Sequence, residues 1–213
     1  MGLKKASQKS LPQKIMQRQI ILALLGMSLS ACARTPPPLP APHSFAHANY
    51  ALPDKVQFLQ TDKRWAQQSL GGTGESLKSD GCLVTSVAMA LVNLGFRTDP
   101  GDLTNRLKSV SGFTKDGWLV WSGLEKATGG IAKTYFYNRK DDEVIRACLA
   151  AGYYPLVKFD LASRKTHWAM VVKEGSQGFY IRDPMVPARS SILLSSRASG
   201  IDAVRCIGVP AKA

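Results

Sequence analysis

The sequence SDGCLVTSVAMALVNLG, residues 79–95, combines a long apolar run with a cysteine near its start. Its residues 82–94 are apolar on almost every side of a helix, so a helix there, ended by Gly95, has to be buried. A cysteine, Cys82, stands at the first position of this helix. A helix N-terminus presents free N–H groups and a partial positive charge, which favour the thiolate form of a cysteine. The stretch predicts a buried helix that begins with a nucleophile, or else a Cys82 that is only a small buried hydrophobe.

The pattern around this helix predicts a helical first half and a strand-rich second half. In one of the flanking helices Asp99 stands as N-cap and Pro100 at the first helical position, and in another Gly152 is the stop. Helices are expected over residues 61–71, 99–110, 120–130 and 141–152, and strands over residues 153–159, 168–172, 179–183 and 202–209. Helices followed by an antiparallel sheet indicate an α+β fold.

The N-terminus is typical of an export signal. Residues 1–19 contain five Lys or Arg and no acidic residue, and residues 20–31 are an apolar run too short to span a membrane stably. The following LSAC, residues 29–32, resembles the lipobox of bacterial lipoproteins. That resemblance implies removal of residues 1–31 and acylation of Cys32, with Ala33 favouring the outer membrane of a Gram-negative cell; cleavage by an ordinary signal peptidase nearby is the alternative.

Residues 32–53 are rich in proline and predict an extended linker, so the folded domain is expected over residues 54–213. The formal net charge of the chain is +13, but the first 31 residues contain five of its 28 basic residues and none of its 15 acidic ones, so the mature chain carries +8. These charges are scattered and accompany no nucleic-acid motif, which argues against a nucleic-acid partner.

A second group of functional residues lies in KTHWAMVVKEGSQGFYIRDP, residues 165–184. If the two strands form a hairpin centred on Gly175, His167 lies directly opposite Asp183, where a carboxylate can accept from one imidazole nitrogen. That bond leaves the other ring nitrogen for a thiol. Taken separately, His167 is compatible with a strand-edge histidine and Asp183 with a turn residue. By the same alternation Trp168 lies on the other face, as a packing residue.

The order FLQTDKRWA, SDGCLVTSVAMAL, HWAMVV and YIRDP resembles the papain-like cysteine peptidases related to the bacteriocin-processing double-glycine peptidases, known as family thirty-nine. The resemblance covers residues 56–184. It implies Cys82 as nucleophile, His167 as general base, Asp183 as the group that orients the imidazole, and Gln60 as a side-chain donor to the oxyanion. The chain departs from the transporter-linked members because it has neither a membrane-spanning bundle nor a nucleotide-binding motif.

Three functions follow as hypotheses. The first is a membrane-tethered thiol hydrolase of peptide or amide bonds, the second a cell-wall amidopeptidase resembling the NlpC-type lipoproteins, and the third a noncatalytic binding domain that keeps the site residues. For the first we expect a peptide or protein substrate, a monomer, no cofactor and no metal. Attachment is expected through the lipid anchor, with the domain facing the periplasm.

Two further cysteines remain, Cys148 and Cys206. In an oxidising compartment, with Cys32 lipidated and Cys82 held as a thiolate, they are left to form a disulfide. The alternative is a pair of buried thiols, because Cys148 on a helix and Cys206 on a strand can both face the core.

The lipoprotein hypothesis predicts that Cys32→Ser releases the protein from the membrane fraction, as a soluble or an unprocessed form, because the acylated side chain is lost. Membrane fractionation and the mass of the N-terminal peptide measure this. Unchanged membrane attachment and processing in the variant would remove the lipoprotein interpretation.

Overall fold

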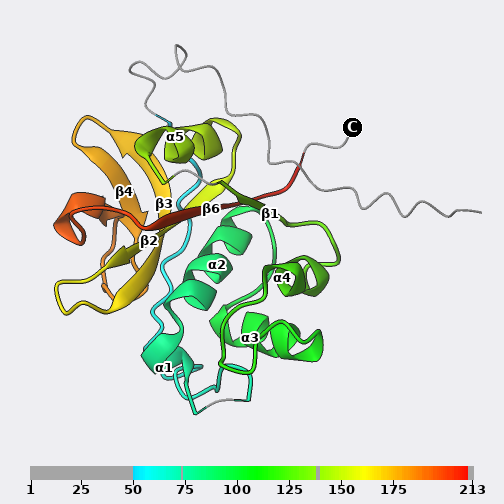
Figure 1. Cartoon of the computed structure of the whole chain (residues 1–213). Coiled ribbons are helices and arrows are strands. Elements are labelled where there is room, and N and C mark those ends of the chain that lie inside the picture. Colours follow the sequence, from blue (N-terminus) through cyan, green and yellow to red (C-terminus); the bar gives the residue numbers. More distant parts are fainter. Residues whose placement is uncertain (1–49, 73, 138–139, 211–213) are drawn as a thin grey trace, which may run out of the picture. The chain divides into compact units, whose positions relative to one another are not determined.

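The computed structural model describes residues 50–72, 74–137 and 140–210 (Figure 1). The expected signal segment, Cys32 and most of the expected linker lie outside the described residues. Among the helices of the described ranges, none has the length and apolar character needed to cross a bilayer.

Five α-helices, a short 3-10 helix and six strands make up the described part of the domain. The helices are α1 (Leu77–Asp80), α2 (Cys82–Asn93), α3 (Pro100–Ser109), α4 (Trp121–Ala127), α5 (Asp142–Ala150) and η2 (Leu194–Ser196). The strands are β1 (Lys133–Phe136), β2 (Tyr154–Asp160), β3 (Thr166–Gly175), β4 (Gly178–Arg182), β5 (Ile192–Leu193) and β6 (Ala203–Gly208). The strands form one antiparallel sheet in the order β1-β6-β2-β3-β4-β5. The α+β prediction is confirmed.

The helix α2 is buried as its composition requires. Nine of its 12 residues are buried, among them Val87, Met89 and Leu91. It packs against one face of the sheet, the α2 face, through Leu156, Met170, Val172 and Ile207. Figure 1 shows α2 lying along the sheet, with α3 and α4 on its far side.

The opposite face of the sheet, the α5 face, forms a second apolar cluster. Val144, Ile145 and Leu149 of α5 pack there against the following sheet residues: Val157, Phe159, Ala169, Val171, Phe179, Ile181 and Val204. The predicted alternation of β3 and β4 side chains between the two faces is therefore confirmed.

The folded part reaches upstream of the expected boundary at Asp54. The Leu52 N–H donates to the carbonyl of Val172 (2.8 Å), the Glu174 N–H donates to that of Tyr50 (2.8 Å), and Ala51 forms a bridge with Lys173. Tyr50, Ala51 and Leu52 thus belong to the sheet, because the end of β3 extends past β2 and leaves backbone groups that this segment satisfies.

The predicted helix over residues 61–71 is wrong. Residues 61–67 form successive turns, in which backbone N–H groups bond three residues back, as from Trp65 to Asp62. The Asp62 carboxylate accepts from the Arg64 amide and guanidinium, and the Trp65 indole donates to the Leu59 carbonyl (2.9 Å). These side-chain bonds stabilise the turns instead of a helix.

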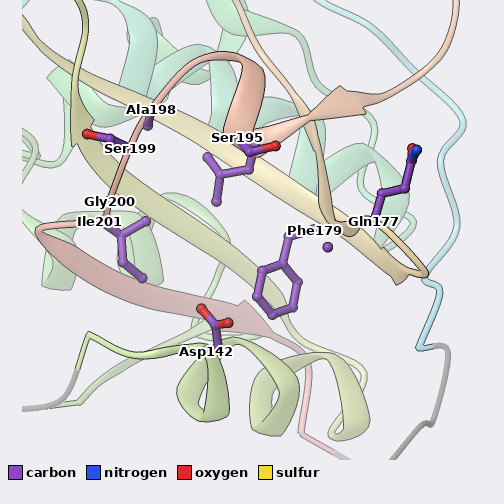
Figure 2. Close-up of a pocket in the computed structure, with 10 residues that line it drawn as sticks. Asp142, Gln177, Phe179, Ser195, Ala198, Ser199, Gly200 and Ile201 are labelled. Atoms are coloured by element: carbon purple, nitrogen blue, oxygen red, sulfur yellow. The ribbon is translucent and has the colours of Figure 1, made fainter.

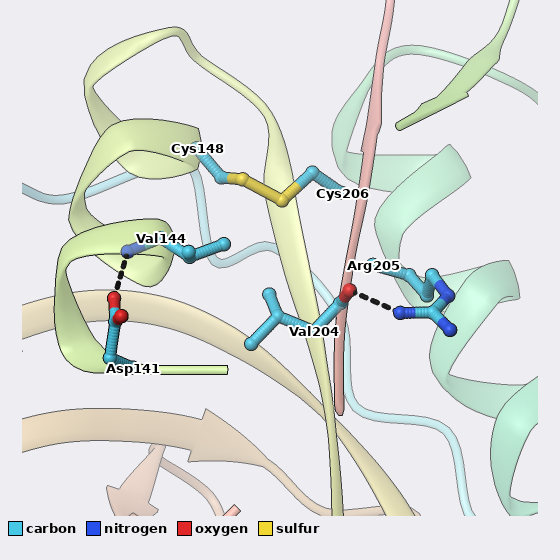
Figure 3. The surroundings of a disulfide bond; sticks show 6 residues. All are labelled: Asp141, Val144, Cys148, Val204, Arg205 and Cys206. Atoms are coloured by element: carbon cyan, nitrogen blue, oxygen red, sulfur yellow. Dashed lines mark hydrogen bonds between the residues drawn. A yellow bond between two sulfur atoms is a disulfide. The ribbon is translucent and has the colours of Figure 1, made fainter. Parts of the chain in front are cut away.

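A disulfide joins Cys148 on α5 to Cys206 on β6, with their Cα atoms 6.0 Å apart (Figure 3). Both cysteines are buried in the α5-face cluster. The bridge closes a loop across 58 positions of sequence and fixes α5 to the sheet.

Replacing both cysteines, as Cys148→Ala with Cys206→Ala, is expected to lower the free energy of unfolding by about 4 kcal/mol, because a loop of this length then adds entropy to the unfolded chain. Urea unfolding measures the loss. Reduced wild-type protein is the matched control and should show a loss of the same direction. Equal stability of oxidised and reduced wild-type protein would contradict the prediction.

Candidate active site

Cys82 is the first residue of α2 and the only unpaired cysteine among the described residues. Gly81 caps the helix without a side chain. A Cβ at Gly81 would collide with the backbone of Leu77, so only glycine lets α1 approach α2 this closely. Cys82 is half-buried and stands at the N-terminus of α2, where the backbone N–H groups have no partner within the helix.

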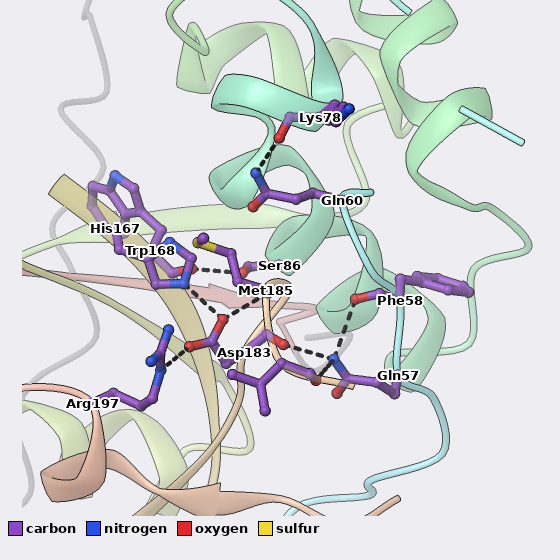
Figure 4. A network of polar contacts seen from close by, with 11 residues as sticks. Gln57, Phe58, Gln60, Lys78, Ser86, His167, Trp168, Asp183, Met185 and Arg197 are labelled. Atoms are coloured by element: carbon purple, nitrogen blue, oxygen red, sulfur yellow. Dashed lines mark hydrogen bonds and ion pairs between the residues drawn. The ribbon is translucent and has the colours of Figure 1, made fainter. Parts of the chain in front are cut away.

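His167 stands near the start of β3, and only 1% of its surface is exposed. Its Nε2 atom lies 2.8 Å from Oδ1 of Asp183, and the edge of the ring meets Phe159 at 5.3 Å between ring centroids (Figure 4). With Nε2 bound to the carboxylate, Nδ1 is the nitrogen left for the thiol of Cys82.

The pKa of His167 is raised to about 9. Burial acts to lower this pKa, but the hydrogen bonds from Asp183 and Cys82, together with the charges of both groups, outweigh it. A raised pKa means that the stability contributed by the imidazolium is fully present below its unfolded value of about 6.5 and is lost as the pH rises through about 9. At neutral pH the ring is charged.

Asp183, which follows β4, is buried and accepts from three donors. Besides His167, the Met185 N–H donates to Oδ1 (2.7 Å) and Nε of Arg197 donates to Oδ2 (2.7 Å). Burial acts to raise the pKa of Asp183, but these partners hold it below its ordinary value. The carboxylate therefore stays ionised at neutral pH and loses its stabilising contribution only as the pH falls into the acid range.

The two residues meet in a register other than the predicted one. The hairpin pairs Gly175 with Gly178, and a bulge between Val171 and Lys173 shifts the register by one residue. Met170 then pairs with Arg182, which places Asp183 diagonally from His167 and not directly opposite it. A diagonal neighbour on the same face remains within reach of these side chains, so the contact forms although the predicted register is wrong.

Gln60 contacts both the segment that follows Asp183 and the segment that precedes Cys82. Its backbone N–H donates to the Pro184 carbonyl (3.0 Å), beside Asp183, and its side-chain Nε2 donates to the carbonyl of Lys78 (2.8 Å), in the helix before Cys82. An amide nitrogen carries two hydrogens, so the bond to Lys78 leaves one of them for another acceptor. The Oε1 atom of Gln60 is buried and has no hydrogen-bond partner among the described residues.

Three positioning side chains escape prediction from the sequence. Ser86 donates to the carbonyl of Trp168 (3.3 Å) and so ties α2 to β3 one turn after Cys82. Gln57 donates to the Asp183 carbonyl (2.8 Å), and Arg197 holds the carboxylate. Of these three, only Ser86 could have been found from the sequence, because it is residue i+4 from Cys82 and therefore lies on the same face of the helix.

Within the described residues, no group of three His, Cys, Asp or Glu could hold a metal ion. A cavity of about 220 Å³ lies elsewhere, between α5, β4 and the segment after β5 (Figure 2). It is lined by Asp142, Phe179 and Ile201, among others, and by none of the residues predicted for the site.

Cys82, His167 and Asp183 together supply a thiol, an imidazole and a carboxylate. This set of groups fits acyl transfer.

Comparison with known proteins establishes the fold. No protein-family model matches the chain, and no curated protein sequence matches it. Among solved structures, the crystal structure of a "putative C39-like peptidase" from Bacillus anthracis is similar, with a TM-score of 0.51 and 13% sequence identity, over 78% of this chain and 100% of that chain. The fold of this chain is thus similar to that of a C39-like peptidase structure, whereas at this identity the chemistry has to be argued from the residues.

The contacts of His167 predict its titration. By NMR, the ring of His167 in the full chain should titrate near pH 9. Cys82→Ala should lower the midpoint because it removes a hydrogen bond and a negative charge, and Asp183→Asn should lower it for the same reasons. The other two histidines of the sequence provide reference signals. A wild-type midpoint at the ordinary value of about 6.5 would contradict this assignment.

Proposed function

We propose that this chain is a cysteine peptidase that hydrolyses peptide or amide bonds. One observation carries the proposal: His167 is buried and bonded at Nε2 to an ionised Asp183, and Cys82 at the N-terminus of α2 is close enough to help raise the pKa of the imidazole. Nucleophile, base and orienting carboxylate in this order are the arrangement that activates a thiol.

In the acylation step, the sulfur of Cys82 attacks the carbonyl carbon of the substrate and forms a tetrahedral intermediate. The His167 imidazolium gives its proton to the leaving amine, and the C–N bond breaks to leave a thioester. In the second step, neutral His167 takes a proton from water while the water oxygen attacks the thioester carbon. The C–S bond then breaks, which regenerates the Cys82 thiolate and releases the carboxylic acid product. His167 thus moves the proton in both steps, while Asp183 keeps Nδ1 directed at the reaction.

The oxyanion of the intermediate needs hydrogen-bond donors that are fixed in advance. The proposed donors are the backbone N–H of Cys82, which starts α2, and the second hydrogen of Gln60 Nε2. The bond from Nε2 to the Lys78 carbonyl supports this role, since it holds the amide against the turn that leads into Cys82.

We further propose that the protein acts in the cell envelope, attached through an acylated Cys32 to the outer membrane. The sequence pattern before Cys32 suggests the anchor. The disulfide between Cys148 and Cys206 supports an oxidising compartment, because disulfides are rare in the cytosol.

Alkylation by iodoacetamide at about pH 6 tests activation of Cys82, since an ordinary thiol is almost wholly protonated there. Cys82 should react rapidly, and His167→Ala should slow the reaction roughly hundredfold by removing the imidazolium that stabilises the thiolate. Peptide mapping separates Cys82 from Cys32. Reaction of Cys82 only above pH 8, unchanged in His167→Ala, would leave the noncatalytic binding domain as the interpretation.

Hydrolysis is tested with the same proteins on a mixture of unlabelled peptides, read by mass spectrometry. New termini should form with the wild type and not with Cys82→Ala, while Asp183→Asn should retain reduced activity because its ring is less firmly oriented. Rapid alkylation without any cleavage would restrict the substrate to amides other than the peptides offered, such as those of the cell wall.

A further inference from the structure

Three aromatic side chains form a strip beside the site. The rings of Trp168 and Trp121 lie 6.4 Å apart, and those of Trp121 and Phe136 lie 5.7 Å apart, both edge to face. Trp168 follows His167 on β3, Trp121 begins α4, and Phe136 ends β1. We call these three residues the aromatic strip.

The strip lies along the end of the sheet where the site is. Because neighbouring strands are antiparallel, the start of β3 and the end of β1 fall at the same end of the sheet. Three strand spacings separate β3 from β1, a distance of about 14 Å. The two tryptophans are half-buried, but 44% of the Phe136 surface is exposed. The strip therefore begins on the α2 face of the sheet at Trp168, the chain neighbour of His167, and reaches solvent at Phe136.

An arginine side chain stands at the open end of the aromatic strip. The Arg205 guanidinium lies over the Phe136 ring, 4.9 Å from its centroid, and also donates to the Val204 carbonyl (2.8 Å). Figure 3 shows Arg205 pointing away from the disulfide, toward the helices. Within the described ranges, no carboxylate lies within ion-pair distance of this half-buried arginine, and burial lowers its pKa.

A second cation, Lys158, pairs directly with Trp168 across β2 and β3, so its side chain leaves the sheet on the same face. It too forms no ion pair within the part of the chain that the structure describes. Partial burial of a guanidinium costs free energy, because the charged group loses contact with water, and binding of an anion offsets this cost. The planar N–H donors of the guanidinium match the two oxygens of a carboxylate.

We propose that the aromatic strip and Arg205 form a substrate subsite for an acidic peptide segment, in which an apolar side chain packs on the rings and a carboxylate binds Arg205. This inference rests on the proposed function and adds a substrate class to it. The rings supply apolar contact without selecting one residue, whereas the uncompensated cation selects for charge. Bound in this way, a peptide extends from the nucleophile toward β1.

Peptide selection on the full chain carrying Cys82→Ala tests the subsite without any need for catalysis. The probe is a mixture of random hexapeptides, acetylated and amidated so that neither end is charged. The immobilised protein should enrich peptides that have Asp or Glu near an aromatic or aliphatic residue, roughly tenfold over the input, because hydrogen bonds to a charged group are among the stronger ones.

Two added substitutions locate the effect. Arg205→Gln should abolish the enrichment of acidic residues, and Phe136→Ala, at an exposed position, should reduce retention of the apolar neighbour. Arg97→Gln is the matched control. Arg97 is exposed and lies between α2 and α3, and its substitution removes the same charge from the protein. Its selection should equal that of Cys82→Ala alone.

Absence of acidic enrichment, or enrichment that persists in Arg205→Gln and in Phe136→Ala, would overturn the subsite. Enrichment lost equally in Arg97→Gln would also overturn it, because net charge alone would then explain binding. Failure of Cys82 alkylation together with successful, Arg205-dependent selection would remove the peptidase function and leave an acidic-peptide binding surface.

Discussion

Burial of α2 is the constraint on which the rest of this structure depends. A helix that is apolar on nearly every side has to be enclosed, and here the sheet and the helices α3 and α4 enclose it. Its two ends cannot be covered by apolar groups alone, because the free N–H groups at the N-terminus and the free carbonyls at the C-terminus need polar partners. The same packing that buries Met89 and Leu91 therefore brings a polar helix end, and Cys82 with it, to the start of β3.

The site that results is a row of neighbouring polar groups. Arg197, Asp183 and His167 are in direct contact, and Cys82 completes the row. Arg197 and His167 both contact the Asp183 carboxylate, so burying this carboxylate costs less than it would alone. Replacing any member leaves a neighbour uncompensated, which is why Arg197, remote from the thiol, belongs to the same physical unit.

Local chemistry made much of this predictable. The Asp99 cap of α3, the apolar surface of α2 and the alternation along β3 are decided by neighbouring residues, and each was readable in the sequence. Other features depend on contacts with distant residues, so no local sequence pattern predicts them. They are the turns at residues 61–67, the short strands β1 and β5, and the bulge near Val172. Cys82, His167 and Asp183 stand in sequence motifs that make them candidate site residues, whereas Arg197 stands in none, because its contact with Asp183 depends on the folding of a separate segment.

The segment that enters the domain at Tyr50 has a geometrical consequence. It joins the sheet beside Val172, about 17 Å along β3 from His167, and then runs past Asp54, whose carboxylate bonds Arg182 (2.6 Å), to Gln57 and Gln60. The residues from Tyr50 to Gln60 thus run the length of β3, so one short segment pairs with the end of this strand and places Gln60 beside Pro184 near its start.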